Sequence, residues 1–294
     1  MRCAIIGVSG QLATELRRRP LPADITLSPP ERVDVTDGPA TSSFLNGCSP
    51  DIVINASAYT AVDRAEGERD RAFAVNEAGP ALLADWCKQR GRALIHVSTD
   101  YVFDGQKSSP YVETDQPAPL GVYGQSKLAG EAAIAERLQE HVVLRTSWVF
   151  SAHGHNFLKT MLKLAAEREH LRVVADQIGR PTAAADLADA VLCVAGAAAR
   201  GRAAWGTFHF AGGGATSWHG FASEIVAEQA TITGKRPAVQ AISTAEFPTP
   251  TRRPANSVLD TSRFEAAYEL SPRSWKLGMQ EAVAELLRGS RIPT

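Results

Sequence analysis

Tyr123 and Lys127, two residues of opposite acid–base character, are four positions apart in the segment that begins at Val122. If this segment is helical, the phenol and the ammonium lie on the same face. A cation beside a phenol favours the phenolate and lowers a pKa that starts near ~10, which would suit acid–base chemistry near neutral pH. The alternative is an ordinary solvated helix face, since a Tyr-x-x-x-Lys spacing often arises by chance.

A hydroxyl that could join this pair belongs to Thr99. It follows the apolar run Ala93-Leu94-Ile95-His96-Val97, which predicts a buried strand. Thr99 would then stand at the carboxyl end of that strand, the edge at which open α/β sheets bind their ligands. The sequence therefore predicts that Thr99, Tyr123 and Lys127 meet at this edge.

A glycine turn stands near the start of the chain. A strand is predicted at residues 2–6, Gly7 and Gly10 follow it, and Leu12 and Leu16 begin a helical period. Gly7 permits a tight turn, Gly10 lets the backbone approach a pyrophosphate, and the helix start offers unpaired N–H groups. This context favours a dinucleotide site over an ordinary strand-to-helix turn.

The sequence does not decide between NADPH and NADH. The strand predicted at residues 24–27 ends at Ser28, where proteins that prefer NAD often carry a carboxylate for the adenosine ribose. A further short strand is predicted at residues 33–37. Its Asp34 would either reach an adenine amino group or cap a helix that starts near Thr41.

Small residues follow the strand predicted at residues 51–55 and leave room for a ligand against the backbone. Within them, Thr60 is a candidate contact on the nicotinamide side. Asn76, in the amphipathic helical region that comes next, is expected to be a buried polar brace rather than a ligand.

Two residues further along are candidates for contact with a second ligand. Trp148 ends the strand predicted at residues 142–148, where it would either stack on a sugar or base or belong to the core. Arg253 lies in a proline-containing loop at residues 249–257. It could clamp a diphosphate through bidentate hydrogen bonds, or it could be an ordinary surface arginine.

The predicted elements indicate the fold class. At least five strands alternate with helices, which is typical of an α/β protein with a Rossmann-like, doubly wound parallel sheet. We expect a dinucleotide-binding domain at residues 1–150, to which residues 171–200 return. Residues 151–294 would form mainly a smaller, discontinuous substrate-binding lobe.

Composition excludes several classes of partner. Hydrophobic residues make up 44% of the 294 residues, as in a soluble globule, and the net charge of −1 gives no support for nucleic-acid binding. No apolar run approaches the ~18 residues of a membrane span, and no signal-peptide pattern precedes the first strand. The four cysteines show no CxxC pairing, so a reducing cytoplasmic location is expected.

Taken together, seven motifs resemble the extended short-chain dehydrogenase/reductase superfamily, and within it most closely the dTDP-4-dehydrorhamnose reductase family. They are Gly7-Val8-Ser9-Gly10-Gln11-Leu12, Asn55-Ala56-Ser57-Ala58-Tyr59-Thr60-Ala61-Val62-Asp63, Ser98-Thr99-Asp100-Tyr101-Val102-Phe103-Asp104-Gly105, Val122-Tyr123-Gly124-Gln125-Ser126-Lys127-Leu128-Ala129-Gly130-Glu131, Arg145-Thr146-Ser147-Trp148-Val149, Asp176-Gln177-Ile178-Gly179-Arg180-Pro181-Thr182 and Arg253-Pro254-Ala255-Asn256-Ser257. They span nearly the whole chain in one order. The first and fourth are shared across the superfamily, and the others narrow the match.

The resemblance implies NAD(P)H-dependent reduction of the C4 keto group of a dTDP-sugar. Tyr123 would be the general acid, Lys127 would hold the nicotinamide ribose and depress the phenol pKa, and Thr99 would hydrogen-bond the reacting oxygen. The resemblance implies that the following residues line the dinucleotide: Gly7, Gly10, Gln11, Leu12, Asp34, Val35, Ala58, Tyr59, Thr60, Tyr123 and Lys127. The implied contacts of the sugar nucleotide are Thr99, Asp100, Trp148, Arg253 and Asn256.

Some members of the family pair as homodimers through a Mg2+ ion that carboxylates from both subunits bridge. Glu15 and Asp189 could be remnants of such a site, but Ala185 stands where another carboxylate would be wanted, so we predict no metal. Two further departures, Ala13 at the usual third glycine and Ser28 at the ribose position, weaken any inference about cofactor preference.

Two other readings stay open. A sugar-nucleotide epimerase or dehydratase would keep the Tyr/Lys pair, although Tyr101 stands where a dehydratase usually carries a second acid after Asp100. A non-catalytic regulatory subunit, like the beta subunit of methionine adenosyltransferase, could retain the same residues.

Overall fold

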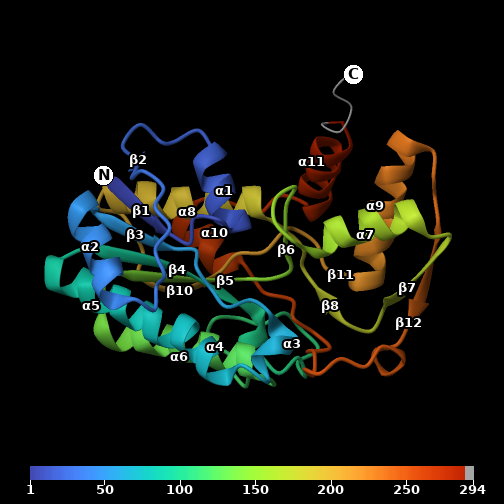
Figure 1. Cartoon of the computed structure of the whole chain (residues 1–294), viewed down its shortest axis with the longest axis horizontal. Helices are drawn as coiled ribbons and strands as arrows, with labels where there is room; N and C mark the ends of the chain where they lie inside the picture. The colour runs from blue at the N-terminus through green and yellow to red at the C-terminus, as the bar shows by residue number, and fades with distance from the viewer. Residues whose placement is uncertain (289–294) are drawn as a thin grey trace.

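The computed structural model describes residues 1–288, and a parallel sheet of six strands lies at its centre (Figure 1). In order across the sheet the strands are β10 (Gly206–His209), β5 (His141–Thr146), β4 (Ala93–Thr99), β3 (Ile52–Asn55), β1 (Arg2–Ile6) and β2 (Thr26–Leu27). Every pair in this sheet is parallel. The predicted α/β fold class with a doubly wound parallel sheet is thereby confirmed.

Helices cover both faces of this sheet (Figure 1). On one face lie α1 (Gln11–Arg18), α8 (Ala184–Ala199) and α10 (Ser262–Tyr268), and on the other α2 (Gly38–Cys48), α5 (Gly79–Arg90) and α6 (Val122–Arg137). Because both faces are covered, the central strands β3 and β5 are buried along their whole length. The short helices α3 (Val62–Ala65) and α4 (Arg69–Phe73) lead through a π-helical turn at Ala74–Ala78 into α5.

A smaller lobe with its own apolar core lies beside the carboxyl edge of the sheet. Its elements are β6 (Val149–Phe150), α7 (Phe157–Glu167), β7 (His170–Val174), β8 (Ile178–Gly179), β9 (Thr182–Ala183), β11 (Thr216–Ser217), α9 (Trp218–Thr233), β12 (Ala238–Ile242) and α11 (Trp275–Arg288). Its strands form three two-stranded pairs, β7 with β12, β8 with β11, and β6 with β9.

Each of the two parts is built from segments that are not contiguous in the chain. Of residues 171–200, α8 packs against α1 and the sheet, whereas β7 pairs with β12 in the smaller lobe. In the opposite sense, β10 comes from the later part of the chain but completes the edge of the central sheet. Residues 289–294, which the predicted lobe included, lie outside the described residues.

The strand predicted at residues 33–37 is wrong. No strand forms there, and the Asp37 N–H instead donates to the Asp34 carbonyl within the segment. The Asp34 carboxylate also accepts hydrogen bonds from the Thr36 backbone N–H at 2.9 Å and its hydroxyl at 2.8 Å, which closes a local turn. Asp37, rather than Asp34, caps the helix that follows by accepting from the Ala40 N–H.

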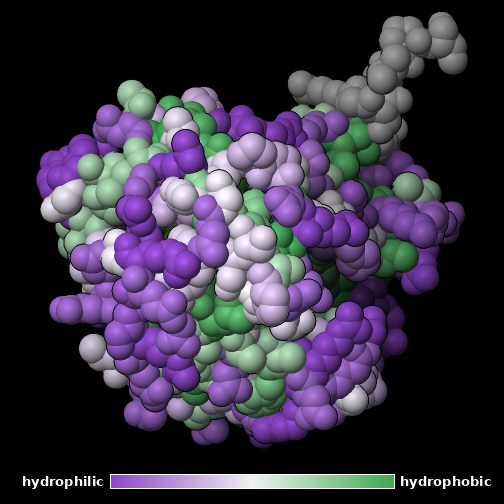
Figure 2. Space-filling view, turned by 60° about the vertical axis from the view of Figure 1, so that its left-hand side comes forward, coloured by the Kyte–Doolittle hydropathy of each residue, from purple (hydrophilic) through white to green (hydrophobic). Residues whose placement is uncertain are grey.

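Hydrophilic residues surround several smaller apolar areas on the face shown in Figure 2. Large hydrophobic side chains that are exposed are scattered and few, namely Met1, Leu21, Phe247 and Leu277 among the described residues. In residues 1–288 there is no helix with the length and apolar character needed to cross a membrane.

Candidate active site

Thr99 ends β4 at the carboxyl edge of the sheet, and two hydrogen bonds hold its hydroxyl. The hydroxyl donates to Asp100 Oδ1 at 3.0 Å and accepts from the Tyr101 backbone N–H at 3.2 Å. Thr99 and Asp100 are both buried. Burial raises the pKa of the Asp100 carboxyl to about 6, although hydrogen bonds from Ser257 and Thr99 act in the opposite direction.

Tyr123 lies in the first turn of α6, half-buried, with its ring edge-to-face on Tyr101 at a centroid distance of 5.6 Å. Gly124 makes this packing possible, because a Cβ there would stand 2.2 Å from the Tyr101 carbonyl oxygen. Burial raises the pKa of the Tyr123 phenol above its ordinary value, and a hydrogen bond with Thr99 opposes the rise. This is opposite to the lowering expected from the sequence, because burial disfavours the charged phenolate.

Lys127 stands one helical turn after Tyr123 and is buried against β4. Its Nζ donates to the Val97 carbonyl oxygen at 2.7 Å and lies 3.1 Å from His96 Nε2. Burial lowers the pKa of the Lys127 ammonium to about 8, and the charge of Glu131 opposes this. The structure thus places Thr99 on β4 and Tyr123 and Lys127 on the helix α6 that packs against it, with Thr99 hydrogen-bonded to Tyr123.

A buried ion pair beneath these groups was missed by the sequence analysis. Arg145 of β5 donates to both carboxylate oxygens of Glu131, at 2.6 to 3.1 Å, and the Ser98 hydroxyl donates to the same carboxylate. The signal that could have found Glu131 is its position four residues after Lys127, on the same face of α6. Arg145 could have been found as a charged residue within an otherwise apolar strand.

The glycine turn fits a dinucleotide. Gly7 has φ +95°, and a Cβ there would stand 2.7 Å from the Ser57 nitrogen, so the turn packs closely on the end of β3. Gly10 precedes α1, which has no side-chain cap and no acidic residue in its first turn. Its first N–H groups and the positive end of its dipole are therefore available to a pyrophosphate.

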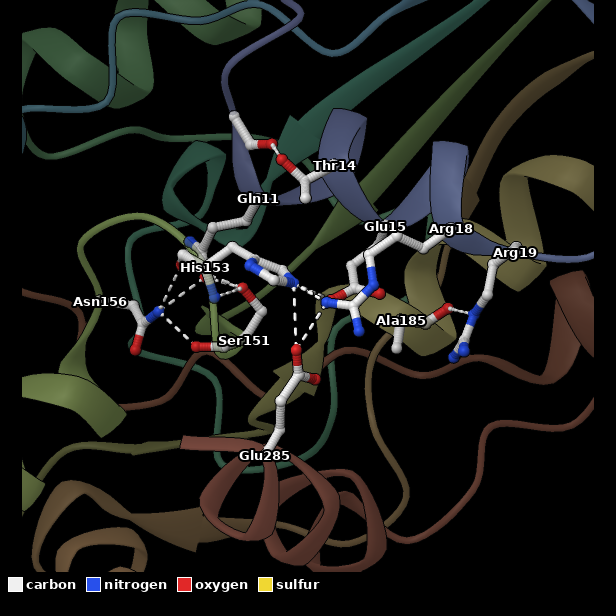
Figure 3. Close-up of polar contacts among 11 residues, drawn as sticks. Gln11, Thr14, Glu15, Arg18, Arg19, Ser151, His153, Asn156, Ala185 and Glu285 are labelled. Carbon is white, nitrogen blue, oxygen red and sulfur yellow. Dashed lines mark hydrogen bonds and ion pairs between the residues drawn. The ribbon is translucent and has the colours of Figure 1, made fainter. Parts of the chain in front are cut away.

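Gln11 is tied to the loop that follows β6. Its Oε1 accepts from the Ser151 hydroxyl at 3.1 Å and from Asn156 Nδ2 at 2.9 Å, and Figure 3 shows all three side chains converging. Leu12 is buried in the core, so that only its backbone can face a ligand. The first turn of α1 is thereby fixed to the chain that leads into the smaller lobe.

The remaining residues expected near the dinucleotide follow β3 and the second strand. The Tyr59 N–H donates to Asn76 Oδ1 at 2.8 Å, and Asn76 Nδ2 donates to the Tyr59 carbonyl and to Ser126. Asn76 is therefore the buried brace that was expected, and it holds the segment with Ala58 and Thr60 against α6. The carboxylate of Asp34 is bound to Thr36, and Val35 is buried against Gly79.

The residues expected near a sugar nucleotide lie in different surroundings. Trp148 has the left-handed φ of +48° and stacks on Trp218, with ring centroids 3.6 Å apart. Arg253 binds Asp63 at 2.7 Å and lies over the Tyr101 ring, next to Tyr123. The Asn256 amide donates to the carbonyls of residues 107 and 109, which makes it a brace of that loop.

Glu15 and Asp189 each face a basic side chain. Glu15 lies 3.5 Å from His153 Nε2, and Asp189 lies 3.1 Å from Arg19 Nε. Glu15 and His153 form one cluster with Arg18 and with Glu285 of α11, and we call these four residues the seam (Figure 3). Within residues 1–288, no group of three or more His, Cys, Asp or Glu side chains is placed to hold a metal ion.

Comparisons with known proteins match this chain to one family over nearly its whole length. A family model described as the RmlD substrate binding domain matches residues 1–288. A dTDP-4-dehydrorhamnose reductase of Sinorhizobium fredii is 43% identical over 291 residues, which cover 98% of each chain.

Two solved structures with the same name are also similar. That from Clostridium acetobutylicum has a TM-score of 0.89 at 36% identity, covering 97% of this chain and 99% of the other. That from Bacillus anthracis, in complex with NADP, has a TM-score of 0.87 at 35% identity with the same coverage.

Proposed function

Because this chain belongs to the dTDP-4-dehydrorhamnose reductase family, we propose that it reduces the C4 keto group of dTDP-4-dehydro-L-rhamnose to give dTDP-L-rhamnose. The observation that supports the proposal is the placement of Thr99 at the carboxyl end of β4, with Tyr123 and Lys127 on the helix packed against that strand, at the same edge of the sheet as the glycine turn. NADPH or NADH supplies the hydride that reaches C4 of the sugar.

Tyr123 is the proton donor in this proposal. The phenol holds its proton at neutral pH, as a general acid requires, although burial raises its pKa and makes the proton harder to release. The proton passes from Tyr123 Oη to the carbonyl oxygen as the hydride arrives at C4, which forms the C–H and O–H bonds of the alcohol. The phenolate that is left takes a proton from solvent before the next turnover.

Thr99 and Lys127 support this step. The Thr99 hydroxyl is held by Asp100 and the Tyr101 N–H, so its direction is fixed before the substrate arrives. The Lys127 ammonium offsets the negative charge that develops on the phenol.

The smaller lobe would hold the sugar nucleotide above this edge, with Trp148 at its entrance and Arg253 beside Tyr101. Support comes from the left-handed backbone of Trp148, since strained residues cluster at ligand sites. We assign residues 1–146, α8 and β10 to the dinucleotide-binding part, because they form the central sheet and its covering helices.

The cellular setting is also a proposal. The four cysteines are free in the structure, which is consistent with the reducing cytoplasm. A homodimer is expected from the resemblance alone, and light scattering of the purified protein would test it.

The experiment is an assay of nicotinamide absorbance with a panel of 4-keto sugar nucleotides. A reductase oxidises one cofactor for each sugar that it converts. An epimerase would convert sugars without net oxidation of cofactor, because the hydride returns to the substrate, and a regulatory subunit would do neither.

A further inference from the structure

A line of buried polar side chains runs from the glycine turn to Lys127. Ser57, which packs against Gly7, donates to Asn55 Oδ1 through its backbone N–H at 3.1 Å and its hydroxyl at 2.6 Å. Asn55 Nδ2 lies 3.0 Å from His96 Nδ1, and His96 Nε2 lies 3.1 Å from Lys127 Nζ. Asn55 and His96 are 0% exposed and Lys127 1%, so these polar atoms must satisfy one another.

The hydrogen-bonding atoms fix the tautomer of His96. A backbone N–H can only donate, so the atom of Asn55 that faces Ser57 is the amide oxygen. The amide NH2 therefore faces His96, and since it also can only donate, Nδ1 must carry a lone pair. A neutral imidazole has one proton, which then lies on Nε2, the nitrogen that faces Lys127.

This tautomer favours the neutral amine form of Lys127 over the ammonium. An ammonium would place N–H against the Nε2–H in a buried site, which costs free energy. A neutral amine accepts that hydrogen with its lone pair and still has an N–H for the Val97 carbonyl, 2.7 Å away. The imidazolium form is disfavoured too, because a proton on Nδ1 would meet the Asn55 NH2.

The other ionisable groups around His96 and Lys127 do not remove this unfavourable contact between the ammonium and the Nε2–H. Glu131, on the same helix, favours the ammonium, but its carboxylate is bound by Arg145 of β5. His141 of β5 disfavours a charged imidazole. Tyr123, on α6, is neutral while it holds its proton.

We propose that Asn55 and His96 are positioning residues that set the proton affinity of Lys127, and through it the alkaline limit of catalysis. The inference rests on the proposed function. Tyr123 becomes a phenolate in the reaction, and only a charged Lys127 offsets that negative charge. Activity should therefore fall as the pH rises past the point at which Lys127 loses its proton.

Asn55→Asp is the substitution that tests this. The carboxylate keeps one oxygen for Ser57 and places the other against His96 Nδ1, where it accepts a hydrogen bond. The proton then moves to Nδ1, and Nε2 becomes an acceptor for the ammonium of Lys127. We expect the alkaline limb of the kcat/KM profile to move up by about one pH unit or more, a tenfold rise in proton affinity. The KM for cofactor should change little.

The matched control is Asn46→Asp. Asn46 is exposed and its Oδ1 accepts from Trp86 Nε1 at 3.1 Å, which a carboxylate oxygen can also do. It adds the same charge without touching His96, so the alkaline limb should stay in place. An unmoved limb in Asn55→Asp, with reductase activity intact, would overturn the inference while leaving the proposed function in place.

A second measurement does not depend on activity, and its deciding result comes from the wild-type protein. Nitrogen NMR of histidine-labelled wild-type protein, with the His96 signals assigned by their loss in His96→Gln, reads the tautomer directly. We expect the proton on Nε2 in the wild type and on Nδ1 in Asn55→Asp. A wild-type ring protonated on Nδ1 would refute the inference, whether or not the protein proves to be a reductase.

Discussion

Two charged regions of this molecule have ion pairs of nearly equal length in opposite surroundings. Beneath the candidate active site, Arg145 and Glu131 approach to 2.6 Å with side chains only 6% exposed. At the seam, Arg18 and Glu285 approach to 2.7 Å with side chains 45% and 44% exposed. Water solvates the Arg18–Glu285 pair but not the Arg145–Glu131 pair, so burial rather than distance decides what each charge does.

The comparison extends to proton affinity. In the buried region the pKa of Lys127 is lowered to about 8 and that of Asp100 is raised to about 6, in both cases first by burial. Perturbed groups that gather at the edge of a sheet are typical of catalytic sites, whereas the seam carries its charges as partners of one another.

The largest effect is expected for Tyr123→Phe. It removes the proton donor but keeps the aromatic ring against Tyr101, so turnover should fall by roughly 10²–10⁴ while cofactor affinity changes little. Steady-state kinetics and cofactor titration measure the two quantities. Near-full turnover in this variant would show that the proton comes from elsewhere.

Glu131→Gln comes next. It keeps the shape of the side chain but leaves Arg145 buried without its charge partner, which should lower the free energy of unfolding by about 3–5 kcal/mol. Urea denaturation of variant and wild type gives the difference. A loss below about 1 kcal/mol would mean that water reaches this pair, as it does at an exposed one.

A pH-dependent change is expected for Asp100→Asn. The raised pKa means that the folded protein binds the Asp100 proton more tightly than the unfolded chain does. Asp100 therefore destabilises the fold increasingly as the pH rises from about 4 to about 6, and by a constant amount above that. Asparagine lacks this penalty, so the gain in urea midpoint over wild type should be larger at about pH 7.5 than at about pH 5.

Asp104→Asn is the control of opposite sign. Hydrogen bonds from the Gln106 N–H and the Tyr111 hydroxyl lower the Asp104 pKa, so its carboxylate stabilises the fold above the pKa of the unfolded chain and loses that effect as the pH falls. The urea midpoint of Asp104→Asn should therefore fall further below that of the wild type at about pH 7.5 than at about pH 5. If the urea midpoints of the two variants changed with pH in the same direction, the raised pKa of Asp100 would be contradicted.

The smallest effect is expected at the seam. Glu285→Gln makes the same chemical change as Glu131→Gln but at an exposed pair, and should cost less than about 1 kcal/mol and shrink further with added salt. Urea midpoints at low and high salt measure it. A loss as large as that of Glu131→Gln would remove the distinction between the two regions.

Local patterns in the sequence predicted much of this structure. The strand, glycine turn and helix at residues 2–18 and the spacing of Tyr123 and Lys127 are short-range signals, and the structure has each of them. The strand expected at residues 33–37 failed because the local hydrogen bonds of Asp34 outweighed the alternation of apolar residues.

What the sequence could not predict depends on long-range packing. The link from Asn55 through His96 to Lys127 requires β3, β4 and α6 to be aligned in space. The direction of the Tyr123 pKa shift depends on how deeply the phenol is buried, which no spacing along the chain reports. The seam likewise joins α1 to α11, at the two ends of the chain.

The most direct test of the central claim is to mix purified protein with dTDP-4-dehydro-L-rhamnose and either NADPH or NADH. Nicotinamide absorbance and dTDP-L-rhamnose are then followed together. We predict that one cofactor is oxidised for each molecule of dTDP-L-rhamnose formed, and that Tyr123→Phe nearly abolishes both signals. Failure of the wild-type protein to oxidise either cofactor with this sugar would contradict the account.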